Sequence, residues 1–390
     1  MLNLHWMFTL ALELALCCTP ATCAEWSLAS FVVTNDDVAA PSPGGLTFYP
    51  VNADGTLGNG TVVATGGNGT GGGNFGLDRV IVAPNSSEPC VYASDAGSGD
   101  IAGIDAATLT VTGRFKGSNS DNGVTNGIGL AANSKYLYAA YTTSYTIATF
   151  QQQQGCTLQF TGDLFTFGLS GGWVSGMAVS GNMMVVAYGD GSVESFDLSG
   201  GAPVSNGDAQ YSTGSAEDVL PNGVAITRDG HYAIFGDAST RASVEVSDIS
   251  SGKLAPTLAY LAGTAWNSAN VRVSPDETVL FAVNNSSGQV TAAFFDKTTG
   301  VVTPGCTSLT LRGFYTNFAY AGNIGFQLAT GAGGTLYVPE FGSGGTSYVA
   351  LLRFTSSGST CTLTEAPGSP LSDPDPSSAV LSLAVYPAVP

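Results

Sequence analysis

The sequence predicts an all-β protein, a seven-bladed β-propeller with four-stranded antiparallel blades. Three observations predict it. Glycine is abundant, at 52 of 390 residues, and no long amphipathic helical run occurs. Apolar segments that are followed by a polar turn recur at the spacing of propeller blades. Each end of the chain also carries one strand without a counterpart, so we expect one C-terminal strand and three N-terminal strands to close the ring.

The first strand of each repeat is an apolar segment that ends in a turn. These segments start 48, 49, 47, 47, 55 and 55 residues apart. They are VIVAPN from Val80, IGLAANS from Ile128, MAVSGN from Met177, VAITRDG from Val224, VRVSPDE from Val271, FQLATGAGG from Phe326 and LSLAVYP from Leu381.

A second apolar strand follows each of these segments. The predicted second strands are Cys90–Asp95, Tyr136–Tyr141, Met184–Asp190, Tyr232–Asp237, Val279–Asn285 and Thr335–Glu340, with Ser30–Asn35 as the N-terminal counterpart. A third strand and a hairpin come next, as in Gly45–Leu57. Asp-Gly and Ser-Gly pairs at the hairpin tips supply the positive φ that tight turns require.

The chain is expected to be one domain over residues 25–390, preceded by a signal peptide over residues 1–24. An apolar run from Trp6 to Cys18 precedes Thr22 and Ala24, which suit the −3 and −1 positions of a cleavage site. Glu13 and the lack of a basic n-region depart from that pattern, and a lipoprotein anchor is the less favoured alternative. We therefore expect a secreted or periplasmic protein.

Four cysteines remain after the signal: Cys90, Cys156, Cys306 and Cys361. In an exported protein they allow two disulfides, with three connectivities left open. No cysteine or histidine cluster has zinc spacing, and the only histidines are His5 and His231.

The formal net charge of −18 argues against binding to nucleic acid or to an anionic membrane. No second apolar stretch is long enough to span a bilayer. The charge is compatible with metal ions, neutral sugars or basic partners, although the acids could serve only solubility. We expect a monomer that binds a small molecule, a carbohydrate or a protein.

Several segments resemble the YVTN-repeat and lactonase-like propellers, including the 6-phosphogluconolactonase type. The segments are FVVTNDD, GLTFYPVNADGTL, VSPDETVLFAVNN and EAPGSPLS. The resemblance covers the mature chain and implies the propeller fold and, for activity, opening of a cyclic ester. Family members often carry Pro-His before a first strand, whereas this chain has Pro221-Asn222-Gly223. His231 is predicted to lie in a turn on the opposite face.

In a four-stranded blade, the start of strand one and the end of strand two lie on the same face. We therefore expect amides and carboxylates to ring the channel mouth there. Such groups could hold a hydroxyl-rich ligand or Ca²⁺. The alternative is that they only satisfy the backbone of turns. The predicted ligand-binding residues are Asn126, Asn222, Asn270, Asn323, Asp95, Asp237 and Trp266, and the candidate Ca²⁺ ligands are Asp95, Asp237 and Glu340.

Loops between blades cross the same face and carry aromatic residues suited to sugar or peptide binding, although packing between blades would explain them equally. They are Trp173, Trp266, Phe314, Tyr315, Phe318 and Tyr320.

Two functions remain open from the sequence. The favoured one is a non-catalytic binding module that uses the channel mouth. The alternative is a lactonase-like hydrolase without a histidine, in which Glu340 or Glu217 acts as general base and Arg272 stabilises an oxyanion. Arg272 is the cation expected to point into the channel, with Arg79 second, and either could instead form a structural ion pair.

Overall fold

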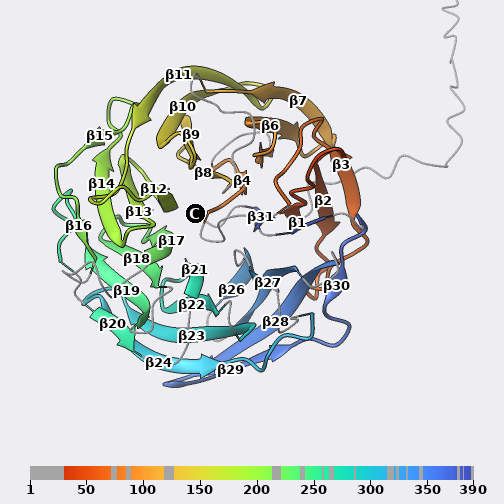
Figure 1. The fold of residues 1–390 in the computed structure, drawn as a ribbon. Coiled ribbons are helices and arrows are strands. Elements are labelled where there is room, and N and C mark those ends of the chain that lie inside the picture. Colours follow the sequence, from red (N-terminus) through yellow and green to blue (C-terminus); the bar gives the residue numbers. More distant parts are fainter. Residues whose placement is uncertain are drawn as a thin grey trace, which may run out of the picture.

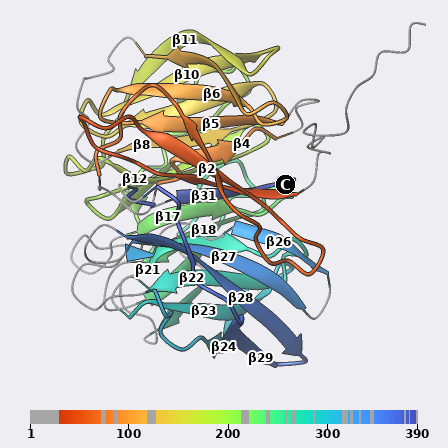
Figure 2. The same cartoon turned by 90° about the vertical axis from the view of Figure 1, so that its right-hand side faces the viewer.

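The strands form seven antiparallel sheets arranged as blades of a ring (Figure 1). The computed structural model describes residues 30–71, 77–84, 89–117, 127–212, 221–237, 242–256, 259–262, 268–284, 287–313, 320–321, 325–330, 333–341, 346–375, 378–380 and 382–387, and these ranges contain no helix. The inner strands of all the blades surround the ring centre in Figure 1, and Figure 2 views the ring from its side. The predicted all-β, seven-bladed propeller is confirmed.

The first four blades have the following strands, from the inner to the outer one. Blade 1 has β31 (Ser382–Tyr386), β1 (Phe31–Asn35), β2 (Gly45–Pro50) and β3 (Thr61–Ala64). Blade 2 has β4 (Val80–Val82), β5 (Cys90–Asp95), β6 (Asp100–Asp105) and β7 (Thr110–Phe115). Blade 3 has β8 (Ile128–Ala132), β9 (Tyr136–Tyr141), β10 (Thr146–Gln153) and β11 (Thr157–Phe165). Blade 4 has β12 (Val174–Ser180), β13 (Met183–Tyr188), β14 (Ser192–Asp197), β15 (Val204–Ser205) and β16 (Gln210–Tyr211).

Blades 5 and 6 have four strands each, and in blade 7 both the inner and the outer strand are divided in two. Blade 5 has β17 (Pro221–Ile226), β18 (Tyr232–Asp237), β19 (Ala242–Asp248) and β20 (Ala259–Ala262). Blade 6 has β21 (Ser268–Val273), β22 (Val279–Asn284), β23 (Gln289–Asp296) and β24 (Val301–Thr307). Blade 7 has β25 (Tyr320–Ala321), β26 (Gly325–Thr330), β27 (Gly333–Phe341), β28 (Ser347–Ser357), β29 (Thr360–Glu365) and β30 (Leu371–Ser372).

The outer strand of blade 4 departs from the regular plan because it is broken in two. Both β15 and β16 pair with β14, on either side of a turn in which Gly207 has a φ of 67°. In the break, the Asp208 carboxylate accepts hydrogen bonds from the backbone N–H and the hydroxyl of Ser195, at 2.9 and 2.5 Å. A side chain thus replaces the missing strand partner.

The hairpin tips have the turn chemistry that their sequences predict. Gly55 of the Asp54-Gly55 pair has a φ of 77°, and Gly230 of Asp229-Gly230 has a φ of 71°. A side chain at either position would force an L-residue into a region that it rarely adopts.

The ring closes through strands from the two ends of the described chain. β31 pairs with β1 in antiparallel register, from Phe31 opposite Tyr386 to Asn35 opposite Ser382. The rings of Phe31 and Tyr386 stack with their centroids 5.1 Å apart. One C-terminal and three N-terminal strands therefore share blade 1, as predicted, and no open edge remains at the closure.

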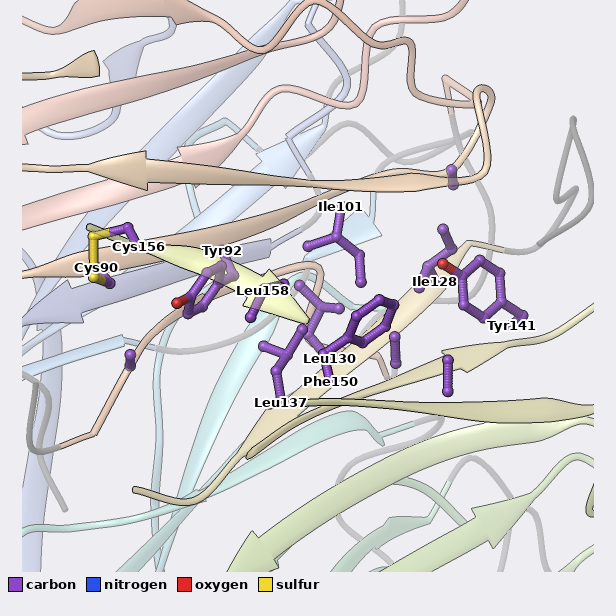
Figure 3. Close-up of a cluster of buried hydrophobic side chains, with 14 residues drawn as sticks. Cys90, Tyr92, Ile101, Ile128, Leu130, Leu137, Tyr141, Phe150, Cys156 and Leu158 are labelled. Carbon is purple, nitrogen blue, oxygen red and sulfur yellow. A yellow bond between two sulfur atoms is a disulfide. The ribbon is translucent and has the colours of Figure 1, made fainter. Parts of the chain in front are cut away.

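The core lies between neighbouring blades and not in one central mass. Between blades 2 and 3, residues such as Tyr92, Leu137 and Phe150 pack together with almost no exposure (Figure 3). Burying a side chain of this size contributes about 1.5–3 kcal/mol. Each blade is thus stabilised mainly by its neighbours, which explains why ring closure matters.

Two disulfides join neighbouring blades. Cys90 of β5 bonds Cys156 at the β10–β11 turn, at the edge of the cluster in Figure 3, and Cys306 of β24 bonds Cys361 of β29. They link blade 2 to blade 3 and blade 6 to blade 7. Of the three connectivities that the sequence left open, the structure selects this one.

Candidate functional site

One face of the ring, which we call the mouth face, collects the starts of the inner strands and the ends of the second strands. The strand register shows this in several blades, because Ile128 is opposite Tyr141, Pro221 is opposite Asp237 and Ser268 is opposite Asn284. The polar residues predicted at those two places therefore lie on one side of the molecule.

Arg272 joins two blades that are not neighbours. It lies on β21 of blade 6, and its guanidinium forms an ion pair with Asp78, which precedes β4 in blade 2. β21 and β4 lie on either side of the ring centre (Figure 1). The two side chains are 21% and 22% exposed. The pair therefore spans the centre and can be reached by solvent.

Asn270 holds the Arg272 side chain in place. Its Oδ1 accepts a hydrogen bond of 2.7 Å from Arg272, which also donates to the Val271 carbonyl at 3.0 Å. Asn270 itself is fully buried. It therefore positions the cation instead of facing a ligand as the sequence suggested.

Glycines let the inner strands of blades 4, 5 and 6 approach one another. A Cβ on Gly223 would lie 2.8 Å from the Cα of Asn270, and one on Gly176 would lie 2.1 Å from the carbonyl oxygen of Asn222. Either contact is too short for a real side chain. The Asn222 side chain remains half-buried at the same place. Close approach of these strands thus explains the glycine of the Asn-Gly pair.

Asp95 is buried at the end of β5. Its Oδ1 accepts a hydrogen bond of 2.8 Å from the Thr65 hydroxyl, and Gly67 lies directly over its Oδ2. Burial raises the pKa of Asp95 to about 7, and the Thr65 hydrogen bond offsets part of that shift. Asp100, directly opposite in β6, pairs with Arg114, yet burial also raises its pKa. This hairpin therefore holds two carboxylates that resist ionisation.

Glu340 lies near the end of β27 and is fully buried, without a hydrogen-bond partner for either oxygen within the described residues. Burial raises its pKa to about 8, and the nearby charge of Glu365 adds to the shift. Gly313 packs against its Oε2, and the Gly313 N–H, which does not meet hydrogen-bond geometry, offsets part of the rise in pKa. Within the described chain, the Arg272 guanidinium bonds to Asp78, Asn270 and Val271 and makes no ion pair with Glu340. Glu340, one of the two general bases proposed for hydrolysis, is therefore not paired with the cation, and the other, Glu217, lies outside the described residues.

Several second-strand ends serve the local backbone. Asp190 accepts hydrogen bonds from the backbone and hydroxyl groups of Ser170 and Ser192. Asn35 donates to the Ser94 carbonyl of the next blade at 3.0 Å, and Asn284 accepts from the Ser287 N–H at 3.2 Å. Asp237 is completely buried under the mouth face. Asp190 and Asn284 therefore satisfy the backbone of turns, whereas Asn35 links two blades.

Four predicted site residues lie outside the described residues: Asn126, Asn323, Glu217 and Trp266. Three of the predicted loop aromatics, Phe314, Tyr315 and Phe318, also fall outside them. Trp173 is described and is 39% exposed.

The predicted Ca²⁺ ligands belong to three different blades. Asp95 is in blade 2, Asp237 in blade 5 and Glu340 in blade 7. Within the described ranges, no group of three or more His, Cys, Asp or Glu residues is placed to hold a metal ion. The same ranges contain no helix that is long and apolar enough to cross a membrane.

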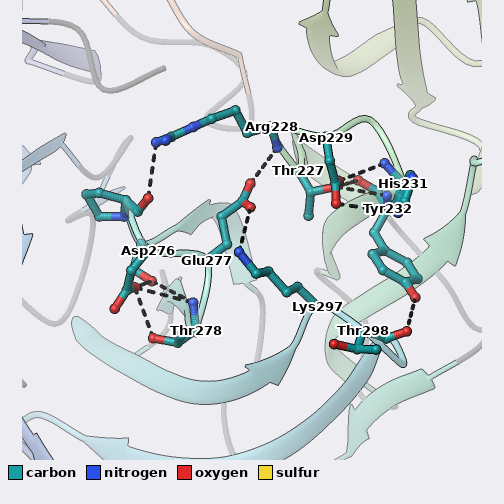
Figure 4. A network of polar contacts seen from close by, with 12 residues as sticks. Thr227, Arg228, Asp229, His231, Tyr232, Asp276, Glu277, Thr278, Lys297 and Thr298 are labelled. Atoms are coloured by element: carbon teal, nitrogen blue, oxygen red, sulfur yellow. Dashed lines mark hydrogen bonds and ion pairs between the residues drawn. The ribbon is translucent and has the colours of Figure 1, made fainter. Parts of the chain in front are cut away.

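The opposite face carries His231 in an ordinary surface network (Figure 4). His231 lies 3.4 Å from Asp229, and the two side chains are 57% and 41% exposed. Glu277 accepts from the Arg228 N–H and pairs with Lys297 at 3.7 Å nearby. The exposure fits the prediction of a solvated turn residue.

Sequence reasoning missed one residue at the ring centre, Asp78. Asp78 lies two residues before the first strand that starts at Val80, just as Asn222 lies two residues before Val224. The repeat alignment therefore contained the signal that places Asp78 among the polar residues expected at the channel mouth. Arg79, the second candidate for the channel, is fully buried in an ion pair with Asp37 at 2.6 Å, which is the structural alternative that the sequence left open. This second pair joins blade 2 to blade 1.

The comparisons with known proteins agree on the fold. No family model and no curated protein sequence matches the chain, so the YVTN resemblance stays a prediction. A Bacteroides fragilis protein provisionally assigned as a 6-phosphogluconolactonase superimposes with a TM-score of 0.63 at 15% identity, covering 94% of this chain and 99% of that one. A Bacteroides uniformis protein of the same provisional assignment gives 0.66 at 13% identity, with 91% and 99% covered. The β-propeller domain of Swd1 from Myceliophthora thermophila gives 0.53 at 11% identity, with 75% and 87% covered. At these identities the likeness concerns the fold alone.

Proposed function

We propose that this chain is an exported, non-catalytic binding propeller that holds a small, uncharged, hydroxyl-rich ligand at the mouth face, over the Arg272–Asp78 pair. The observation that carries the proposal is the pairing of Arg272. Its guanidinium binds Asp78 and Asn270, and it remains about one-fifth exposed. A group that is held in place but still reachable by solvent is suited to recognition.

The chemistry of the pair suits hydroxyl groups. A guanidinium only donates hydrogen bonds, an ionised carboxylate only accepts them, and a hydroxyl group does both. The half-buried amide of Asn222 adds a donor and an acceptor at the same face. The net charge of −18 disfavours an anionic ligand overall. A neutral sugar or sugar lactone meets these requirements.

Ring opening of a lactone makes further demands that the site does not favour. It needs a general base near the attacking water and a donor near the developing oxyanion. Glu340 is fully buried, and within the described chain it forms no ion pair with Arg272, so no described general base lies beside the cation. The two Bacteroides neighbours are provisionally assigned as 6-phosphogluconolactonases, but at 15% and 13% identity they support the propeller fold and not turnover in this chain.

Export is supported by covalent chemistry. Disulfides persist in oxidising compartments, and the structure contains two of them, Cys90–Cys156 and Cys306–Cys361. The predicted signal peptide over residues 1–24 would supply the route to the outside.

Calorimetry and a turnover assay on the same protein test the proposal. The probes are glucose, glucono-δ-lactone and gluconate, each with and without CaCl₂. We expect glucose or the lactone to bind, Arg272→Met to weaken binding at least tenfold, and the rate of lactone opening to stay at the uncatalysed level. The matched control is Arg228→Met, because Arg228 is an exposed arginine on the opposite face.

Two results would overturn the proposal. Accelerated lactone opening that Glu340→Gln abolishes would establish the hydrolase instead. Equal binding by the Arg272→Met and Arg228→Met proteins, or no binding of any of the three probes, would remove the ligand site from the ring centre.

A further inference from the structure

The connection from blade 3 to blade 4 exposes an unusual amount of apolar surface. Phe165, Phe167, Leu169 and Trp173 are 63%, 51%, 51% and 39% exposed. They are four of the nine large hydrophobic residues that are exposed within the described residues, and they lie within a single segment of the chain. The ring of Phe165 lies 5.4 Å from that of Phe167 and 6.4 Å from that of Tyr145. We call these five residues the aromatic ridge.

The backbone beneath the ridge is firmly held. The Thr166 N–H donates to the Tyr145 carbonyl at 2.8 Å, and the Leu169 N–H donates to the Ser192 hydroxyl at 3.1 Å. The Ser170 N–H donates to the Asp190 carboxylate at 2.6 Å. The polar groups of the segment thus bond inwards to two hairpins, while its large side chains point outwards. Such a surface loses little conformational entropy on binding.

The charged groups that the structure places beside the ridge are mostly acidic. The Asp190 carboxylate accepts from the Ser170 N–H of the segment, and Glu194 is joined to Thr166 through the Tyr188 hydroxyl. One cation, Lys116, precedes Gly117, which packs beside Asp163. Asp163 lies two residues before Phe165, on the same side of β11. Exposed apolar side chains in an acidic surrounding complement a partner with apolar anchors and basic groups.

The ridge is a poor match for its other conceivable occupants. A sugar needs hydrogen-bonding groups next to the rings, but Asp190, Ser170 and Ser192 already bond to one another. The rings of Phe165 and Phe167 are tilted by 58° and offer no common plane. A second copy of this chain would bring the same acids face to face, and an anionic membrane would be repelled.

We infer that the aromatic ridge docks a segment of another protein in which apolar side chains alternate with Lys or Arg. This site is separate from the proposed ligand site at the ring centre, and neither depends on the other. The apolar side chains would pack on Phe165 and Phe167, and the basic groups would face the surrounding acids.

Fluorescence anisotropy with three labelled synthetic peptides tests the inference. The first peptide alternates Leu or Trp with Lys, the second has Glu in place of each Lys, and the third has Ser in place of each apolar residue. We expect only the first peptide to bind. The Phe165→Ser/Phe167→Ser protein should bind it at least tenfold more weakly than the unchanged protein does. Raising NaCl to about 0.5 M, which screens charge–charge attraction, should also weaken the binding of this peptide to the unchanged protein.

The control protein is Val204→Ser/Val301→Ser, because these valines are 61% and 48% exposed at the far ends of outer strands, on the opposite face. It should bind like the unchanged protein, as should Arg272→Met. If the control lost as much peptide affinity as Phe165→Ser/Phe167→Ser, the peptide would be binding to exposed apolar surface without specificity, and the inference would be overturned. Equal binding of the Glu peptide would also overturn it. The same holds if cello-oligosaccharides or anionic vesicles bind and Phe165→Ser/Phe167→Ser abolishes that binding, or if sedimentation shows self-association through the ridge.

Discussion

The two arginine–aspartate pairs near the ring centre have the same chemistry in different surroundings. Arg79 and Asp37 join neighbouring blades and are both fully buried. Arg272 and Asp78 join distant blades, and about one-fifth of each side chain is exposed. Removing one partner of a buried pair leaves a charge without compensation, whereas water can replace a lost partner at an exposed pair. Burial therefore separates a pair that holds the ring together from a pair that is available to a ligand.

The largest effect is expected at the buried pair. Arg79→Met should lower the free energy of unfolding by about 3–5 kcal/mol, because the Asp37 carboxylate would remain buried without its cation. Urea denaturation measures this. If Arg79→Met lowered the free energy of unfolding by less than Arg272→Met does, the distinction between the two pairs would be contradicted.

The next effect concerns a buried carboxylate without a cation at hydrogen-bond distance. Because the pKa of Asp95 is raised to about 7 in the folded chain, folded Asp95 keeps its proton when the unfolded chain has lost it. Its contribution to stability is therefore greatest below the unfolded pKa of about 3.9 and is lost as pH rises to about 7.

Asp95→Asn should remove that decline, which is on the order of 3 kcal/mol between pH 4 and pH 8. Denaturation curves at pH 4, 6 and 8 measure it. Asp54→Asn is the control, since Asp54 is exposed and hydrogen bonds from Thr56 lower its pKa. If the control flattened the decline as much as Asp95→Asn, the assignment to Asp95 would be wrong.

A double variant sharpens the comparison further. Arg79→Met/Asp37→Asn removes both charges, and Asn tolerates the φ of 42° at position 37. We expect it to be more stable than Arg79→Met alone by about 1–3 kcal/mol, because no unpaired charge stays buried. No recovery would mean that Arg79 acts through packing and not through charge.

The smallest effect is expected at the partly exposed pair. Arg272→Met should change the free energy of unfolding by only about 1 kcal/mol, while it weakens ligand binding at least tenfold. A thermal-shift measurement made alongside the calorimetry separates the effect on stability from the effect on ligand binding. A loss of stability as large as that of Arg79→Met would make Arg272–Asp78 a structural pair and remove the basis of the ligand site.

The sequence predicted the blades because strand periodicity and turn residues are local properties. VLFAVN and CVYASD appear as strands with little or no error in their bounds. The partners across the ring are not local. Nothing near Arg272 in the sequence points to Asp78, and four cysteines alone do not specify which pairs bond.

The aromatic ridge was also beyond the reach of the sequence pattern. The segment DLFTFGL continues the alternation of a strand, and alternation does not tell whether an outer strand has a neighbour over its apolar side. Trp173 was predicted as a loop residue on the mouth face, whereas Phe165 and Phe167 were not singled out. Only packing distinguishes them from core residues.

The closure of blade 1 has a consequence for biosynthesis. β1 cannot find its inner neighbour until β31 exists, and the two strands lie 351 residues apart, from Phe31 to Ser382. At the usual rate of about 5–20 residues per second, β1 waits for roughly 20–70 s with one edge unsatisfied. During that interval the nascent chain offers a ready template for wrong pairing, so a ribosome that stalls late would release a product prone to aggregate.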